Sequence, residues 1–355
     1  MKDDYLWDGS GEPDPEIQRL ETALGRYRHN LPAPAFEAIA EIRPTATRQR
    51  FLNFRLSFGL AAAASLLIAV TLFIYLRPKP TTDLGPAWDV ARLEGAPRVG
   101  SHSISANGGL GKLGVGQTLV TDSSSRASIS LDEIGRVDVD ADTRLRVVRN
   151  GPNRKRLALD RGTIHATIWA PPGEFVVDTP SAVAVDLGCV YTLHVDDSGA
   201  GLLRTTLGWV GFKLNGHESF IPAGAVCATR PKIGPGTPYF EDASASFREA
   251  LSKFDFAGHT PEERSASLDV ILAQSRSRDA LSLWHLLARV SDSERARVYD
   301  RLLVLAAPPA GVTREGILRL DQPMLDLWWN SLGFGDVSLW RTWEHDWSQR
   351  QTNVK

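Results

Sequence analysis

The chain has 355 residues, of which 43% are hydrophobic and 23% are charged, and its formal net charge is −2. This composition is typical of a globular protein of about two or three domains, and the near-neutral charge argues against a nucleic-acid-binding protein, which usually presents a basic face. Two cysteines are too few for a disulfide scaffold, and they cannot form a four-ligand zinc site without histidines at suitable spacing.

Residues 1–55 are predicted to form a small helical module. Asp14 is a favourable N-cap with Pro15 at the first helical position, and apolar side chains then recur at steps of three and four residues, as on one face of a helix. The members of this face are Ile17, Leu20, Leu24 and Tyr27. Such a face either binds a partner or packs against the aromatic side chains of the same module, and the pattern leaves both open.

An uncharged stretch of the chain runs from Leu56 to Leu76. As a helix it would be about 31 Å long, which matches a hydrocarbon core of about 30 Å, and an apolar run of this length is rare in a soluble domain. We therefore predict a transmembrane helix over residues 56–76. Four arginines lie close before this stretch and only Arg77 and Lys79 lie close after it, which predicts a cytoplasmic N-terminus by the positive-inside rule.

The pattern changes after a linker predicted at residues 77–94. Short runs alternate apolar and polar side chains, and glycines separate them, which is the pattern of β-strands. Examples are Ala127-x-Ile129-x-Leu131, Val137-x-Val139, Leu157-x-Leu159, Ile164-x-Ala166-x-Ile168 and Tyr191-x-Leu193-x-Val195. Many short strands at regular spacing predict a β-rich domain over residues 95–235, as a sandwich, a barrel or a coiled β-roll.

The succession of motifs in this region resembles a FecR-type domain. The motifs are Gly116-Gln117-Thr118-Leu119-Val120-Thr121, Gly135-Arg136-Val137-Asp138-Val139, Phe175-Val176-Val177-Asp178-Thr179-Pro180, Leu187-Gly188-Cys189-Val190-Tyr191, Gly208-Trp209-Val210 and Pro222-Ala223-Gly224. The resemblance implies a solenoid-like periplasmic β domain on a single-pass inner-membrane protein. It also implies an anti-sigma regulator, which senses an outer-membrane transporter and holds or releases a cytoplasmic sigma factor.

Two features depart from the family pattern. Cys189 stands where the family usually has threonine after the glycine, and the N-terminal segment lacks the zinc-binding His/Cys pattern of many anti-sigma domains. Cys189 and Cys227 both lie in the outer domain, where an oxidising periplasm would favour a disulfide. That bond would close a loop of about 38 residues and stabilise it by about 4 kcal/mol. Two buried free thiols on separate strands are the alternative.

A helical period predicts a C-terminal domain over residues 240–347, followed by a frayed tail at 348–355. Thr260-Pro261-Glu262-Glu263 is a capping box with proline at the first helical position, and it predicts a helix that ends near Gln274. Six tryptophans lie in the predicted C-terminal domain, either in its core or on a surface that binds a partner or glycan. Adjacent Trp328 and Trp329 are not expected to face one core together, so one of them is predicted at the surface.

The sequence has no motif of a hydrolase, metalloprotease or nucleotide-binding loop. His165 and His194 occupy strand positions, where histidines are far more often ordinary surface or core residues than metal or acid–base groups. We therefore predict a protein that is not an enzyme and needs no cofactor and no metal. Direct contact with nucleic acid is not expected either.

Together these patterns predict a multidomain membrane protein with a short α-helical cytoplasmic segment, one transmembrane helix, an all-β solenoid-like FecR-type domain and an α-helical C-terminal domain. The predicted location is the inner membrane, with the N-terminus in the cytoplasm and the C-terminal domains in the periplasm. The predicted function is regulation of a sigma factor in response to an envelope signal. The alternative is an anchored envelope protein that binds glycan, peptidoglycan or another protein.

Overall fold

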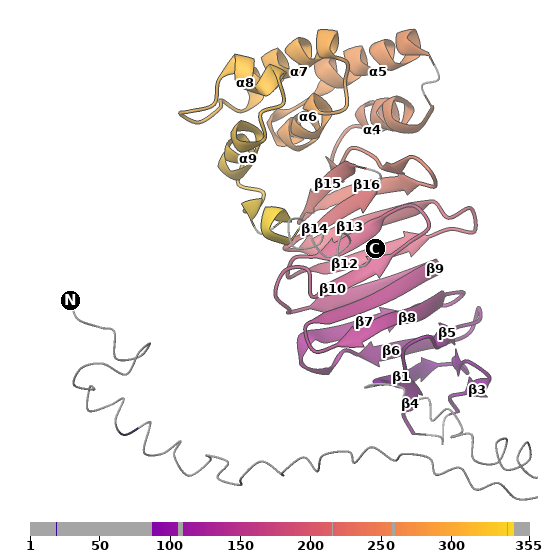
Figure 1. Cartoon of the computed structure of the whole chain (residues 1–355). Helices are drawn as coiled ribbons and strands as arrows, with labels where there is room; N and C mark the ends of the chain where they lie inside the picture. Colours follow the sequence, from indigo (N-terminus) through magenta and orange to yellow (C-terminus); the bar gives the residue numbers. More distant parts are fainter. Residues whose placement is uncertain are drawn as a thin grey trace, which may run out of the picture. The chain divides into compact units, whose positions relative to one another are not determined.

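The computed structural model describes Arg19 and residues 87–343, apart from 106–108, 215, 258–259 and 339. The chain divides into two compact units, Met1–Arg77 and Pro78–Lys355. The predicted helical module at 1–55 and the predicted transmembrane helix at 56–76 lie outside the described residues, except for Arg19. The following description therefore concerns the second unit (Figure 1).

The described part of the chain contains 18 strands. They are β1 (Trp88–Glu94), β2 (Arg98–Val99), β3 (His102–Ser103), β4 (Gly111–Leu113), β5 (Thr118–Val120), β6 (Arg126–Ser130), β7 (Gly135–Val139), β8 (Arg144–Gly151), β9 (Arg154–Ile168), β10 (Phe175–Asp178), β11 (Val183–Asp186), β12 (Val190–Val195), β13 (Gly201–Leu207), β14 (Trp209–Leu214), β15 (His217–Pro222), β16 (Ala225–Arg230), β17 (Gly234–Pro235) and β18 (Tyr239–Phe240).

These strands form two sheets that share β9. Sheet A has the order β4-β1-β6-β7-β9-β12-β13-β16, with β17 and β18 both paired to β16. Sheet B has the order β3-β2-β5-β8-β9-β10-β11-β14-β15. The first half of β9 pairs in sheet B and its second half pairs in sheet A. A single 15-residue strand therefore fixes both sheets in one body.

The strand β9 changes sheets at Gly162. This residue has φ +95°, and a Cβ atom placed there would lie 2.4 Å from the Cα atom of Thr143. The hydroxyl of Thr143 accepts a hydrogen bond from the backbone N–H of Thr163 at 3.0 Å. The close approach and the positive φ both require glycine at this point, so the crossover depends on one residue.

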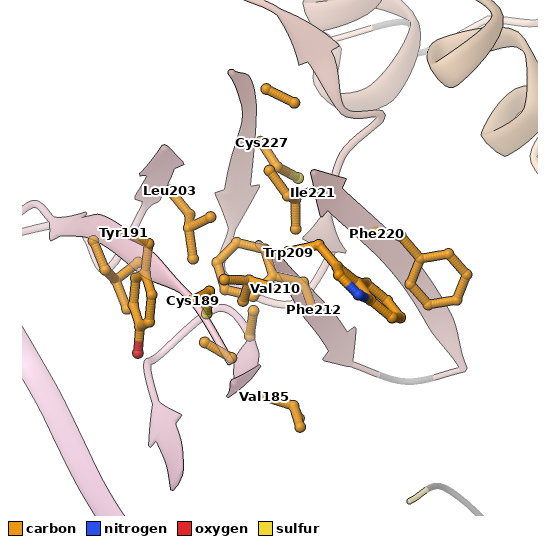
Figure 2. Close-up of a cluster of buried hydrophobic side chains, with 14 of the residues drawn as sticks. Val185, Cys189, Tyr191, Leu203, Trp209, Val210, Phe212, Phe220, Ile221 and Cys227 are labelled. Carbon is orange, nitrogen blue, oxygen red and sulfur yellow. The ribbon is translucent and has the colours of Figure 1, made fainter. Parts of the chain in front are cut away.

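The core lies between the two sheets, and strands such as β6 and β12 contribute to it by burying every second side chain. Strand β6 buries Ala127 and Ile129, and strand β12 buries Tyr191, Leu193 and Val195. Figure 2 shows the part of this core around β11 to β16, where Cys189, Val210, Phe212 and Ile221 lie in one cluster. Alternation with period two thus predicts the buried faces of these strands correctly.

The helices follow the last strand along the chain and gather beyond β15 and β16 (Figure 1). They are α4 (Ala245–Ser252), the π-helix η2 (Lys253–Ala257), α5 (Pro261–Gln274), the short 3-10 helix η3 (Ser277–Asp279), α6 (Ala280–Leu287), α7 (Asp292–Leu305), α8 (Arg314–Leu318) and α9 (Gln322–Ser331); a further 3-10 helix, η1 (Asp132–Ile134), lies between β6 and β7. The predicted capping box at Thr260 is confirmed: the Glu263 N–H donates to its hydroxyl, and its own N–H donates to the Glu263 carboxylate, both at 3.2 Å.

A side chain from α6 closes the free edge of sheet B. In β15, Glu218 and Phe220 direct their backbone groups away from β14, which would leave them unpaired at the edge of the sheet. The N–H of Phe220 donates to Nε2 of His285 at 2.9 Å, and Nδ1–H of the same ring donates to the carbonyl of Leu281 at 2.8 Å. Burial, together with the nearby charge of Arg289, lowers the pKa of His285 to about 3. The ring is therefore neutral, with its proton on Nδ1.

Arg289, in the turn after α6, binds the same edge. Its Nη2 donates to the carbonyl of Glu218 at 2.9 Å and to the hydroxyl of Ser219 at 2.7 Å, and its Nη1 donates to the carbonyl of Pro235 at 2.9 Å. The guanidinium also lies 3.7 Å from the carboxylate of Asp255, and both side chains are about nine-tenths buried. One cation thus joins β15, β17 and η2 to the helical segment, and its charge is compensated inside the protein.

Aromatic side chains fill the space between β15 and the helices. The ring of Phe220 contacts Trp209, Trp284, Trp329 and Trp340 at centroid distances of 5.2 to 5.8 Å. A Cβ atom at Gly211 would lie 2.0 Å from the Trp340 ring, so glycine lets this indole lie directly on β14. The junction is therefore a continuous part of the core.

The prediction that either Trp328 or Trp329 lies at the surface is wrong, because both are fully buried. Trp328 packs against Tyr299 of α7, and Trp329 packs against Trp284 of α6 and Phe220 of β15. Helix α9 is covered on two sides, so adjacent residues can both face packed neighbours. The pattern of one helix could not show that it has two covered sides.

The predicted fold class is also wrong. The described residues contain no helix that is long and apolar enough to cross a membrane. They form no closed solenoid: among the described strands every pairing except β9–β10 is antiparallel, whereas a parallel β-helix stacks its strands in parallel. Alternation identifies strands but not their pairing, and the helices share the core of the sheets.

The neutral state of His285 predicts a pH dependence of stability. Its pKa is about 3 in the folded chain and 6.5 in the reference state, so its contribution is complete above pH 6.5 and is lost as the pH falls toward 3. We expect the free energy of unfolding to lose about 1.4 kcal/mol per pH unit from this group. In His285→Gln, whose amide oxygen can still accept from Phe220, this loss should be absent.

The measurement is urea denaturation of the wild type and of His285→Gln at several pH values between 4 and 6.5. The difference between the two proteins should change with pH by about 1.4 kcal/mol per unit. A difference that stays constant with pH would show that His285 is not held neutral at the edge of β15.

Candidate functional site

The two cysteines do not form the predicted disulfide in the structure. Both thiols are free and buried. The Cys189 thiol donates to the carboxylate of Asp186 at 2.8 Å, and the Cys227 thiol donates to the carbonyl of Gly236 at 3.2 Å. Burial raises the pKa of Cys227 to about 12 and raises that of Cys189 as well, where Asp186 adds to the effect. Both are therefore protonated and unreactive as nucleophiles.

The register of the strands explains why the cysteines do not meet. Cys189 directly precedes β12, Cys227 lies on β16, and β13 pairs with both of these strands. Two strands on either side of a third are about 10 Å apart, and a disulfide needs Cα atoms within about 7 Å. Figure 2 shows the two side chains on different strands of the core. The sequence placed both cysteines in one domain but could not show the strand between them.

The thiol of Cys189 belongs to a buried polar cluster at the turn between β11 and β12. The carboxylate of Asp186 accepts from this thiol and, at 2.7 Å, from the N–H of Gly188. Burial raises the pKa of Asp186 to about 7 despite these hydrogen bonds. The nearby hydroxyl of Tyr191 is also buried and has no hydrogen-bond partner among the described residues. Neutral pH therefore lies close to the point at which this buried acid ionises.

The predicted partner-binding face of the N-terminal helix lies outside the described residues. Its members are Ile17, Leu20, Leu24 and Tyr27. Their role stays a prediction.

A polar network that the sequence did not predict lies on the outer face of sheet A. Nε2 of His165 lies 2.8 Å from the carboxylate of Asp140, and Nδ1 lies 2.9 Å from the hydroxyl of Thr192. Because a carboxylate only accepts, Nε2–H of His165 donates to Asp140. Arg126 donates to the same carboxylate at 2.8 and 3.1 Å. The carboxylate of Asp140 is thereby held by one side chain from β6 and one from β9.

The network extends over the neighbouring positions of the same face. Nδ1 of His194 lies 2.8 Å from the hydroxyl of Thr163, and the hydroxyl of Ser128 donates to Asp138 at 2.6 Å. These residues come from β6, β7, β9 and β12, which are consecutive neighbours in sheet A. The two histidines that the sequence placed on strands thus lie on one exposed face. They come together because β9 and β12 pair in register, with His165 opposite Thr192 and His194 opposite Thr163.

The chemistry of this face suits recognition of a polar ligand. Its aspartate, histidine and threonine are aligned as in a hydrolase relay, but the N–H groups of the four strands are used in the sheet, so no free amides converge on an oxyanion. Among the described residues, no group of three or more histidine, cysteine or acidic side chains could hold a metal ion. Several fixed donors and acceptors across four strands can bind sugar hydroxyls or a polar protein surface.

Asp186 predicts a second pH effect, opposite in sign to that of His285. Its pKa is about 7 when folded and 3.8 in the reference state, so its contribution is complete below pH 3.8 and is lost as the pH rises toward 7. In Asp186→Asn this loss should disappear, and the free energy of unfolding should rise relative to the wild type by about 1.4 kcal/mol per pH unit. Urea denaturation of both proteins across this range checks the slope, and parallel curves would contradict the assignment.

The comparisons with known proteins concern the central part of this fold. The model of the FecR protein family matches residues 117–207. No curated protein matches the chain. Similar solved structures include two crystal structures of a protein proposed to be an anti-sigma factor from Parabacteroides distasonis, each with 14% sequence identity and a TM-score of 0.31. Each match covers 38% of this chain and 64% of the other chain, so the chain spans less than two thirds of those structures.

The family match begins at the residue before β5 and ends with the last residue of β13. It therefore includes the crossover strand β9, the buried Asp186 turn and most of the polar face of sheet A. This match confirms the resemblance that the sequence motifs indicated, over residues 117–207.

Proposed function

We propose that the chain is a regulator of the anti-sigma type, in which the FecR domain receives a signal by binding and the N-terminal segment controls a sigma factor. The FecR domain at residues 117–207 carries this proposal, since the best-studied proteins with such domains are anti-sigma regulators. The apolar face predicted at residues 17–27 supports it, because such a face on a helix can bind a partner.

The architecture around the FecR domain fits a role in binding. Its strands lie in the middle of two sheets that β9 joins, so the polar face of sheet A is held on a rigid scaffold. The helices pack on the β14–β15 end of sheet B and leave the polar face of sheet A exposed. The side chains of His165 and Asp140 are about 42% and 29% exposed. A ligand bound there would meet side chains whose positions are already fixed.

The proposed location is the inner membrane, with the FecR domain outside and the N-terminus in the cytoplasm. The uncharged stretch at 56–76 and the larger number of basic residues before it support this placement. In this arrangement the FecR domain and the sigma-binding segment are on opposite sides of the membrane. Regulation then requires that the chain has two states. The ligand outside and the sigma factor inside must each bind one of these states more tightly than the other.

The alternative of an anchored envelope protein that binds glycan, peptidoglycan or another protein relied in part on the tryptophans of the C-terminal helices. Trp328, Trp329 and Trp340 are fully buried, and Trp284 is 7% exposed. These side chains stabilise the junction and do not present an aromatic surface to a glycan. The anti-sigma proposal therefore has the better support of the two.

Recovery of a sigma factor by the full-length protein tests the proposal. The wild type, solubilised in detergent, should recover a sigma factor from cell lysate, and the double variant Leu20→Asp, Leu24→Asp should lose it because two charges interrupt the apolar face. The matched control is Gln18→Asp, Thr22→Asp, which adds the same charge to the opposite face of the predicted helix.

The control should recover as much sigma factor as the wild type. Mass spectrometry of the bound fraction identifies the partner. Failure of the wild type to recover any sigma factor, or equal recovery by all three proteins, would contradict the anti-sigma proposal.

A further inference from the structure

A row of arginines lies on the outer face of sheet B, away from the polar face of sheet A. Strand β8 contributes Arg144, Arg146 and Arg149, and strand β2 contributes Arg98, which is exposed like the others. We call these four residues the arginine stripe. Arg98, Val120 and Arg144 lie opposite one another across β2, β5 and β8. The Cα atom of Arg98 is therefore about 10 Å from that of Arg144.

A β-bulge keeps all three arginines of β8 on one face. Leu145 and Val147 point into the core, and strict alternation would then bring Arg149 to the core as well. The register shifts between Val147 and Arg149, so that Val147 pairs with Leu157 while Arg149 pairs with the next residue toward the turn, Arg156. The extra residue returns Arg149 to the outer face. The bulge thus maintains an exposed positive charge where alternation would have buried it.

Most of this positive charge is not compensated within the fold. Arg144 lies 3.2 Å from the carboxylate of Asp160, and the neighbouring Arg156 forms two hydrogen bonds of 2.6 Å with Asp178. In the described part of the chain, Arg98, Arg146 and Arg149 have no hydrogen-bond or ion-pair partner. Several other exposed arginines are paired, for example in Arg126–Asp140, Arg161–Asp197, Arg297–Asp269 and Arg314–Asp300.

The outer face of sheet B is covered at its other half but not at the stripe. Over β14 and β15, the ring of Trp340 lies against Gly211 and Phe220 and excludes water from the sheet. Over β2, β5 and β8, the outward residues include Arg98, Thr118, Val120, Arg144 and Arg146, and all of them are exposed or half-buried. The C-terminal helices therefore leave a flat, positively charged strip of the sheet open to a partner.

We propose that the arginine stripe binds an extended acidic segment of a partner protein. Alternate residues of a strand repeat about every 6.6 Å on one face, both in β8 and in an extended peptide. Carboxylates at alternate positions of such a peptide would therefore match Arg144 and Arg146, and each guanidinium can hold a carboxylate through two parallel N–H···O bonds. This binding requires neither the N-terminal segment nor a sigma factor.

Fluorescence anisotropy of the full-length protein with labelled peptides tests the proposal. The probe is a peptide that alternates glutamate and threonine, and the comparison peptide has the same composition with its glutamates in one block. Arg146→Ala, Arg149→Ala should bind the alternating peptide about tenfold more weakly than the wild type, as expected for the loss of two exposed charge pairs. The matched control Arg248→Ala, Arg319→Ala removes the same charge from two exposed positions, one in α4 and one directly after α8, and should bind like the wild type.

Two outcomes would overturn the proposal. One is an unchanged affinity of the stripe variant for the alternating peptide. The other is equal binding of the block peptide, or equal competition by polyphosphate, because the stripe would then respond to charge alone and another class of polyanion would be its ligand. Tighter binding of the alternating peptide, together with its selective loss in the stripe variant, supports the assignment.

Discussion

The free edge of β15 is the constraint on which the rest of this structure depends. A sheet that ends in an unpaired strand leaves backbone donors and acceptors exposed, and it can pair with another chain. Here the edge is buried under the C-terminal helices, so every outward group needs a partner within the chain. The neutral ring of His285 accepts from Phe220 N–H, and Arg289 donates to the Glu218 carbonyl. The C-terminal helices and the two sheets thus form one compact body.

This constraint also determines which surfaces remain for binding. The helices occupy the β14–β15 half of the outer face of sheet B, where small Gly211 admits Trp340. The polar face of sheet A and the arginine stripe of sheet B stay open. They lie on opposite outer faces of two sheets that share β9. Neither surface takes part in the packing of the helices against β14 and β15.

The sequence predicted the strands better than their arrangement. Alternation located the buried residues of β6, β7 and β12, because burial of every second residue is a local property. The union of Leu157–Leu159 and Ile164–Ile168 in the single strand β9 was not predicted, since Gly162 looked like a turn between two strands. Its φ of +95° and its contact with Thr143 show instead a crossover between sheets. Pairing between distant strands is not encoded in any short window.

The site residues show the same limit. His165 and His194 were recognised as strand residues, but their shared network with Asp140 depends on the register of β7, β9 and β12. The order of the strands also explains why the two cysteines are not bonded, because β13 lies between β12 and β16. The order of the FecR motifs indicated the family that matches residues 117–207, but it did not give the pairing of the strands.

Amide hydrogen exchange at Phe220 tests the central claim most directly. This amide belongs to an edge strand and has no partner in β14, so its protection depends on the ring of His285. The account predicts that it exchanges as slowly as amides within the paired strands of the core, near the rate set by global unfolding. Exchange as fast as that of a solvent-exposed edge amide would show that the helices do not close the sheet.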